Sequence, residues 1–177
     1  PKTPKPRRQW MISFRSDHNN KNNHCSSQEF SIQKGKSSKI DFEQVTVPVP
    51  TPETEHFWSG CVAGELRLQQ RDDCSRVYFP PRPFCPDCGH RAVSILCGSG
   101  KARLLSYVIN QRPHPAFDGP YAIAVVELEE GVTMMANILN VPQTPETLIL
   151  DMPLKVAFRP IRQGIVLPYF EPDGADL

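Results

Sequence analysis

The sequence predicts a mainly β protein, and two observations support this. From about residue 92 onward, apolar and polar residues mostly alternate in short runs, as expected for strands with one buried face. Turn signals separate these runs, and the chain holds 19 Pro and 10 Gly among its 177 residues. The main helix signal comes earlier. We therefore expect an N-terminal helix, then a small cysteine-containing hairpin module, then a barrel of strands.

Residues 1–50 are predicted to form a disordered or extended basic tail. Residues 1–44 carry nine Lys and Arg against four Asp and Glu, whereas the rest of the chain carries 11 against 15. Apolar residues are sparse in this tail, so burying them would not offset the entropy lost on ordering. Prolines extend Val45–Pro50. A basic tail therefore precedes an acidic body.

Residues 51–65 are predicted to form a helix that docks on another surface. Thr51, Pro52 and Glu53 suit an N-cap, a first helical position and an acidic first turn, and Gly64 is a stop signal. Apolar residues recur at three- and four-residue spacing: Phe57, Trp58, Cys61 and Val62. Such a stripe must pack on something. Its cysteine is interpreted as a buried structural thiol.

Residues 66–97 are predicted to form a zinc-ribbon-like module. Strand patterns at 66–70 and 77–79 alternate with two cysteine-bearing turns, and a third pattern follows at 92–96. No secretory signal and no apolar run of about 18 residues is found, so we expect a cytoplasmic protein with no membrane partner. Thiols stay reduced in the cytoplasm, which favours a metal knuckle over a disulfide.

The candidate metal ligands are Cys74, Cys85 and Cys88. Three thiolates can hold a structural Zn²⁺ when another donor supplies the fourth ligand. Other donors lie nearby in sequence: Asp72, Asp73 and His90. Arg71 stands where a fourth cysteine would be expected, and a permanent cation cannot bind the ion. The alternative is a ribbon without metal that apolar packing holds together.

Residues 98–177 are predicted to form a five-stranded OB-fold barrel. Five strand patterns are separated by turn signals: 103–110, 121–128, 132–139, 154–159 and 165–170. The cap signature at Thr144–Glu146 predicts a single helical turn between the third and fourth strands. Five strands with a helix after the third are typical of an OB-fold.

Two stretches of sequence resemble a known family. The first runs from P-E-T-E-H-F-W-S-G to F-P-P-R-P-F-C-P-D-C-G, and the second comprises R-P-H-P-A-F-D-G-P-Y-A-I-A-V-V-E-L-E-E-G with a closing L-P-Y-F. Over about residues 51–172 the chain resembles the rubredoxin-like zinc ribbons fused to an OB-fold, catalogued as domain of unknown function thirty-five. Arg71 departs from the four-cysteine site of that family.

The resemblance implies a small non-catalytic accessory subunit of a thiolase-superfamily complex. Its partner would be a catalytic subunit, either a thiolase, an acyltransferase or an aldolase, and a CoA thioester would be the substrate of the complex. The ribbon and N-terminal helix would dock on the partner, and the OB-fold would help to line the acyl-CoA channel.

The proline-rich segment 111–121 is the candidate contact region for substrate or partner. It carries His114, Phe117 and Tyr121, an aromatic and imidazole lining that suits a pantetheine arm or an acyl chain. The alternative is a loop that simply closes the barrel. Arg82 and Arg112 are candidates to meet the CoA phosphates, or else they are ordinary solvated arginines.

Two other functions remain as hypotheses. A single-stranded nucleic-acid binder is one, because OB-folds and zinc ribbons recur in that role, but few Lys or Arg lie in 101–170 and several acids offset them. An independent enzyme is the other, and it would need a nucleophile such as Cys97 with His114. No third group orients that pair in the sequence. We predict no catalytic residues.

Overall fold

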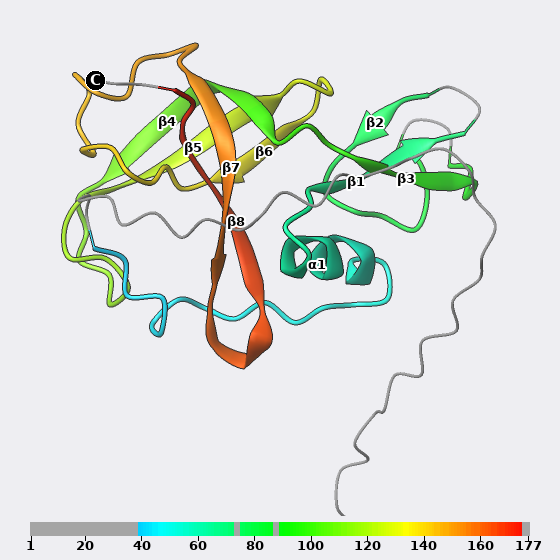
Figure 1. The fold of residues 1–177 in the computed structure, drawn as a ribbon, viewed down its shortest axis with the longest axis horizontal. Coiled ribbons are helices and arrows are strands. Elements are labelled where there is room, and N and C mark those ends of the chain that lie inside the picture. Colours follow the sequence, from blue (N-terminus) through cyan, green and yellow to red (C-terminus); the bar gives the residue numbers. More distant parts are fainter. Residues whose placement is uncertain (1–38, 73–74, 87–88, 175–177) are drawn as a thin grey trace, which may run out of the picture.

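The computed structural model describes residues 39–72, 75–86 and 89–174. A three-stranded ribbon sheet and a curled five-stranded sheet stand side by side, and helix α1 (Glu55–Val62) lies at their junction (Figure 1). The mainly β fold class is confirmed. Within the described ranges, no helix has the length and apolar character needed to cross a membrane.

The five-stranded sheet is the OB-fold barrel. Its strands are β4 (Lys101–Asn110), β5 (Tyr121–Leu128), β6 (Thr133–Ala136), β7 (Pro153–Pro160) and β8 (Val166–Pro172). They pair antiparallel in the order β6-β5-β4-β7-β8. A parallel bridge between Ile138 and Phe170 joins the two ends and curls the sheet. All five strand patterns of the barrel are therefore confirmed.

The connection between the third and fourth barrel strands is a turn, not an assigned helix. Thr147 N and Leu148 N donate to Thr144 O at 3.2 and 3.0 Å, so one helix-like turn closes and does not continue. The buried side chain of Leu148 anchors the turn in the core. The predicted single helical turn is therefore present as one hydrogen-bonded turn.

The ribbon sheet has the order β2-β1-β3, with β1 (Arg67–Arg71) in the centre, β2 (Val77–Tyr78) and β3 (Val93–Cys97). Its first strand begins inside the main core, where Leu66 and Leu68 are almost fully buried against barrel residues. The ribbon is therefore attached to the barrel by a shared core.

Helix α1 begins later than the capping signature predicts. Thr51–Thr54 forms a hydrogen-bonded turn that precedes the helix, and Thr54 occupies the N-cap position without a side-chain cap. Phe57 and Cys61 are buried within this chain, whereas Val62 is 61% exposed. Most of the predicted stripe is therefore used inside the molecule, which removes it as an argument for a docking helix.

Residues 39–50 run extended along the barrel from the β4–β5 loop towards α1 (Figure 1). Ile40 and Phe42 pack against the small cluster that includes Tyr169, and the rings of Phe42 and Tyr169 meet edge to face at 5.7 Å. The basic tail was predicted to be disordered or extended, and its 39–50 part contacts the barrel through these two apolar side chains. The remainder of the predicted tail, 1–38, lies outside the described residues.

Candidate functional site

The structure brings together three predicted contact residues in the β4–β5 loop and the start of β5. The rings of Phe117 and Tyr121 are stacked, with centroids 4.0 Å apart and an interplanar angle of 11°. His114 meets both rings edge-on, at 5.5 Å from Phe117 and 6.0 Å from Tyr121. All three side chains are half-buried. They form one ring cluster, which we call the aromatic cluster.

Hydrogen bonds hold the aromatic cluster in place. Asn110 Nδ2 donates to the Tyr121 hydroxyl at 2.7 Å, and Ala116 N donates to His114 Nδ1 at 3.1 Å. Because Nδ1 accepts, the neutral imidazole carries its proton on Nε2. Asp41 N also donates to the carbonyl of Ala116 at 2.9 Å, so the 39–50 segment braces the loop. The cluster is therefore built on a rigid support.

The same side of the sheet continues into an exposed apolar surface. This outer sheet patch consists of Val108, Ile123, Val125 and Met135. Val108 lies opposite Ile123 in the β4–β5 ladder, and Val125 lies opposite Met135 in the β5–β6 ladder. Val108 is 67% exposed and Met135 is 69% exposed. Since Tyr121 follows the same alternation as Ile123, the patch and the aromatic cluster adjoin.

The outer sheet patch was missed by sequence reasoning, although β5 carried a signal for it. Its first six residues, Y-A-I-A-V-V, are apolar at both parities. Such a run is typical of a strand that is covered on both faces. Here Ala122, Ala124 and Val126 face the core, whereas Ile123 of the other parity is exposed and Val125 is half-buried.

The two predicted phosphate-binding arginines lie in different modules. Arg112 is exposed in the β4–β5 loop, where its backbone N–H donates to Asn110 Oδ1 at 3.0 Å. Arg82 is exposed in the ribbon, and its backbone N–H donates to the buried Gln69 side chain at 2.7 Å. Arg112 therefore adjoins the aromatic cluster, and a role for either guanidinium with phosphate stays a prediction.

Of the predicted zinc ligands, the structure describes Cys85, which is completely buried. Cys74 and Cys88 lie outside the described residues, so the three-thiolate site stays a prediction. Among the described residues, no group of three or more His, Cys, Asp or Glu side chains is placed to hold a metal ion.

The donor set can still be tested against a four-ligand zinc site. Arg71 Nη2 lies 3.3 Å from His90 Nδ1, and because guanidinium only donates, this imidazole nitrogen accepts. The Nδ1 lone pair of His90 is thereby engaged by the guanidinium. A four-thiolate site does not fit this ribbon, since Arg71 stands at the first ligand position.

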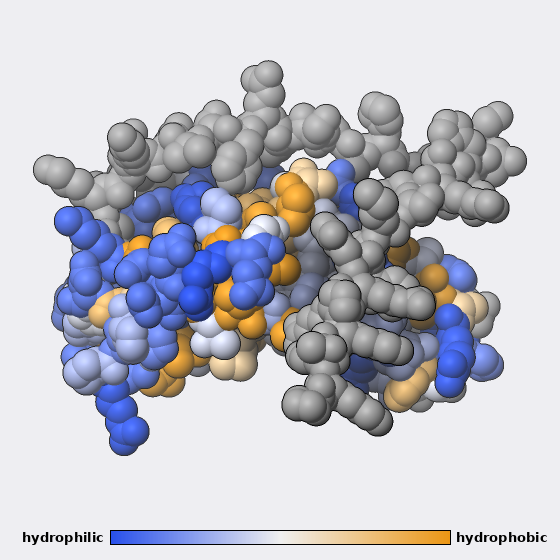
Figure 2. Space-filling model, turned by 90° about the horizontal axis from the view of Figure 1, so that it is seen from below, coloured by the Kyte–Doolittle hydropathy of each residue, from blue (hydrophilic) through white to orange (hydrophobic). Residues whose placement is uncertain are grey.

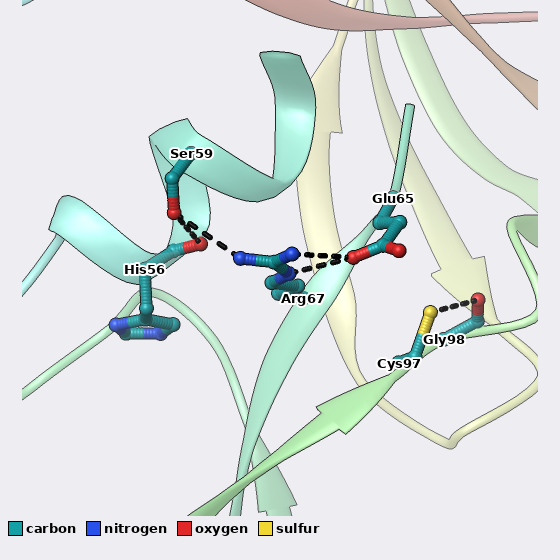
Figure 3. Close-up of polar contacts among 6 residues, drawn as sticks. All are labelled: His56, Ser59, Glu65, Arg67, Cys97 and Gly98. Atoms are coloured by element: carbon teal, nitrogen blue, oxygen red, sulfur yellow. Dashed lines mark hydrogen bonds and ion pairs between the residues drawn. The ribbon is translucent and has the colours of Figure 1, made fainter. Parts of the chain in front are cut away.

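The junction of helix and ribbon contains a group of polar contacts (Figure 3). Arg67 Nε donates to Glu65 Oε2 at 2.7 Å, and Arg67 Nη1 donates to Ser59 Oγ at 3.2 Å. Burial lowers the pKa of the nearby His56, and the charge of Arg67 lowers it further. These contacts tie α1 to β1.

The structure gives the two members of the weighed Cys–His pair different neighbours. Cys97 Sγ lies 4.0 Å from the carbonyl of Gly98 at the ribbon–barrel junction, whereas His114 belongs to the aromatic cluster. The thiol of Cys61 is deeply buried, and burial raises its pKa to about 12. Cys61 is therefore a packing residue, because the thiolate is the reactive form of cysteine.

On the lower side of the molecule, both hydrophobic and hydrophilic side chains are seen where the described residues are visible (Figure 2). The exposed Val62 of α1 is a single apolar side chain of the kind that is normal on protein surfaces. The outer sheet patch with the aromatic cluster is therefore the stronger candidate site.

Two family models match the chain in tandem. Residues 58–94 match the ChsH2 rubredoxin-like zinc ribbon domain, and residues 98–159 match the ChsH2 C-terminal OB-fold domain. A DUF35 domain-containing scaffold protein of Pyrococcus furiosus is 35% identical over 100 residues, which are 55% of this chain and 68% of that protein. This chain belongs to the DUF35 family.

Longer proteins contain a similar DUF35 region. A probable enoyl-CoA hydratase alpha subunit of Thermomonospora curvata is 32% identical over 118 residues, which are 66% of this chain and 36% of that protein. The 3-oxo-4,17-pregnadiene-20-carboxyl-CoA hydratase alpha subunit of Mycobacterium tuberculosis is 30% identical over 120 residues, which are 67% of this chain and 38% of that protein. The DUF35 chain thus spans little more than a third of either relative.

Solved structures agree with the two-module fold. A chain of the Ltp2-ChsH2(DUF35) aldolase superposes with a TM-score of 0.64 at 28% identity, covering 71% of this chain and 98% of that chain. A DUF35 protein of unknown function from Sulfolobus solfataricus gives a TM-score of 0.51 at 15% identity, covering 69% and 86% respectively. The second likeness supports the DUF35 fold alone.

Proposed function

We propose that this DUF35 chain is a non-catalytic accessory subunit of an acyl-CoA-dependent, thiolase-superfamily complex. The outer sheet patch carries this proposal, because a strand that is apolar on both faces implies a second covering surface. The names of its relatives support the chemistry, since two are CoA-linked hydratase alpha subunits and one structure is an aldolase containing a DUF35 chain. The partner would be a thiolase, acyltransferase or aldolase subunit.

The outer sheet patch is proposed as the docking surface on the catalytic subunit. Its flat apolar centre is bounded on one side by the Arg103–Glu127 ion pair and on the other by the aromatic cluster. An apolar centre with a polar rim is the usual composition of a protein interface. This assigns docking to the barrel instead of to α1, whose buried residues are used within the chain.

The aromatic cluster is proposed as a wall of the substrate channel beside that interface. Stacked rings on a rigid loop offer apolar contact to an acyl or pantetheine chain at little entropic cost. Arg112 follows Asn110 in the same loop and is the nearer candidate for a CoA phosphate. Arg82 would contribute only if the complex brings the ribbon towards the nucleotide end of the CoA thioester.

Copurification from the native host tests the docking proposal. We expect tagged wild-type protein to bring down a thiolase-superfamily enzyme, and Val108→Asp or Met135→Asp to weaken that complex at least tenfold, because a charge would be buried at the interface. Val49→Asp is the matched control, since Val49 is 84% exposed and lies outside the patch. Val62→Asp asks whether α1 also docks.

Two outcomes would contradict the proposal. Capture of no such enzyme, or equal capture by wild type and both patch variants, removes the patch as the docking surface. If Val62→Asp alone breaks the complex, α1 is the docking element. Circular dichroism and size-exclusion chromatography confirm that each variant is folded.

Phe117→Ala tests the channel wall once a complex is in hand. We expect the apparent KM for the CoA thioester to rise about tenfold while the complex still forms, since one apolar wall is removed. Ile149→Ala is the control, because Ile149 is 61% exposed in the β6–β7 connection. Unchanged kinetics would return the loop to its structural role of closing the barrel.

A nucleic-acid function has one favourable observation, which is that an aromatic cluster lies on the strand-connecting loop where OB-folds bind oligonucleotides. Base stacking needs open ring faces, however, and Phe117 and Tyr121 already stack on each other. A labelled single-stranded oligonucleotide binding with a steep salt dependence and loss in Phe117→Ala would favour it over the acyl-CoA proposal.

A further inference from the structure

The described residues of the two ribbon knuckles make matching backbone hydrogen bonds. In the first, Arg71 N donates to Arg76 O at 3.0 Å and Ser75 N donates to Arg71 O at 2.9 Å. In the second, Cys85 N donates to His90 O at 2.9 Å and Gly89 N donates to Cys85 O at 2.9 Å. In both knuckles, the N–H of the first residue (i) donates to the carbonyl of residue i+5. The N–H of residue i+4 donates to the carbonyl of residue i.

The backbone dihedrals agree with this correspondence. Residue i+4 has a left-handed backbone conformation in both knuckles, with φ of 53° at Ser75 and 72° at Gly89. Glycine adopts this conformation without strain, whereas serine adopts it only when the surrounding hydrogen bonds demand it. The first knuckle therefore keeps the fold of a metal knuckle although its first residue is Arg71.

Position by position, Arg71 corresponds to Cys85. Cys85 is fully buried, as a ligand at a closed structural site would be. Arg71 is half-buried, and its side chain crosses to the other knuckle, where Nη2 donates to His90 Nδ1 at 3.3 Å. A direct hydrogen bond thus joins the two knuckles at the end of the ribbon where a metal would otherwise join them.

We propose that the Arg71 guanidinium closes this ribbon in place of a four-coordinate zinc ion. Guanidinium stays protonated at any physiological pH, has donors and no lone pair to offer a metal, and repels a divalent cation at the same corner. The rest of the ribbon is held without metal by the buried Leu68 and Tyr78 and by the bond from Arg82 N to the Gln69 side chain. The ribbon thus keeps the backbone hydrogen bonds of its knuckles, but it no longer has four metal ligands.

Arg71→Cys is the direct test, because it places a thiol at the ligand position that Arg71 occupies. The full-length wild-type and variant proteins are expressed in zinc-supplemented medium and compared for zinc content. Co²⁺ titration then reports tetrahedral thiolate ligation through its absorption bands. We expect about one zinc per chain and strong Co²⁺ absorption bands in Arg71→Cys. The Co²⁺ affinity of the wild-type protein should be lower by roughly a hundredfold or more, since even changes outside the ligand shell lower metal affinity 10–100-fold.

Two controls separate gain of a ligand from loss of the cation. Arg71→Ser removes the guanidinium without supplying a thiol, and it should stay without zinc. Arg76→Cys adds a thiol in the same knuckle at an exposed position that is not a ligand position, and it should also stay without zinc. Neither variant is expected to show the Co²⁺ absorption bands that Arg71→Cys shows.

A chelator experiment on wild type keeps the test decisive if Arg71→Cys does not fold. We expect EDTA to leave the wild-type Tm unchanged, because no metal contributes to its folding. Near-stoichiometric zinc in wild type, a Co²⁺ affinity within tenfold of Arg71→Cys, or a Tm that falls on chelation would overturn the proposal. Those results would instead favour the three-thiolate site of Cys74, Cys85 and Cys88 that the sequence suggests.

Discussion

The barrel and the far end of the ribbon are stabilised in different ways. The barrel has a continuous apolar interior in which Leu104, Val126, Leu154 and Phe170 are completely buried. In β3 of the ribbon, whose five residues the structure describes, each residue is at least partly exposed, and Ile95 is 41% exposed. Burial of apolar surface therefore folds the barrel, whereas hydrogen bonds and attachment to the main core hold the ribbon.

This difference teaches where sequence changes are tolerated. A module that depends on a metal loses its fold when a ligand is replaced. A ribbon that shares Leu66 and Leu68 with the barrel core keeps its strands in place by packing at one end. Replacement of a ligand by Arg71 is compatible with the fold because the barrel and α1 supply apolar packing that the knuckles alone do not.

The largest effect should come from truncating the barrel core. Phe170→Ala is expected to lower the free energy of unfolding by about 3–5 kcal/mol, because it opens a cavity where the sheet curls closed. Phe84→Ala makes the same change in the ribbon at a side chain that is 43% exposed, and it should cost less than about 0.5 kcal/mol. Urea unfolding measures both, and similar losses would contradict the contrast.

A smaller effect is expected at the helix that joins the two modules. A Cβ added at Gly60 would lie 2.7 Å from Arg67 Cγ and 2.9 Å from the backbone oxygen of Glu65. Gly60→Ala should therefore destabilise the protein by about 1–3 kcal/mol, although alanine normally favours a helix. Gly119→Ala is the control, since nothing lies within 4 Å of its added Cβ. Thermal unfolding that ranks Gly60→Ala as neutral would mean that the junction is loosely packed.

The smallest effect concerns pH and the same junction. Burial, aided by the charge of Arg67, lowers the pKa of His56 below its usual 6.5. The folded protein therefore binds fewer protons than the unfolded chain, so this contribution to stability is present above about pH 6.5 and is lost as the pH falls. His56→Gln should flatten the dependence of Tm on pH between about 7 and 5, and Arg67→Gln should flatten it partly. An unchanged slope in His56→Gln would assign the acid sensitivity to other groups.

Prediction from sequence was most successful where local patterns and packing agree. All eight predicted strands are present, because they are short runs and most of them end close to a Gly or Pro signal. The helix start was wrong by three residues, since Thr51 and Pro52 belong to a separate hydrogen-bonded turn and Thr54 takes the N-cap position. Docking by this helix stays a prediction, because spacing shows that side chains share a face but not what covers it.

For the candidate site, residue types were predictable and their arrangement was not. His114, Phe117 and Tyr121 were singled out as loop aromatics, yet their stacking depends on Asn110 and on the 39–50 segment, both distant in sequence from at least one ring. The outer sheet patch depends on strand pairing between β4, β5 and β6. Register across strands is a property of the folded sheet.

By itself, the sequence determined the strand order along the chain, the cysteine knuckle and the arginine that interrupts the ribbon, because these follow from residue type and spacing. Only the tertiary structure decided that Phe57 and Cys61 of the helix stripe are internal, that an apolar face of the sheet is exposed, and that the Arg71 side chain bonds to His90 in the other knuckle. The physical reason is that burial and hydrogen-bond partners come from residues far apart in sequence, and folding alone brings them together.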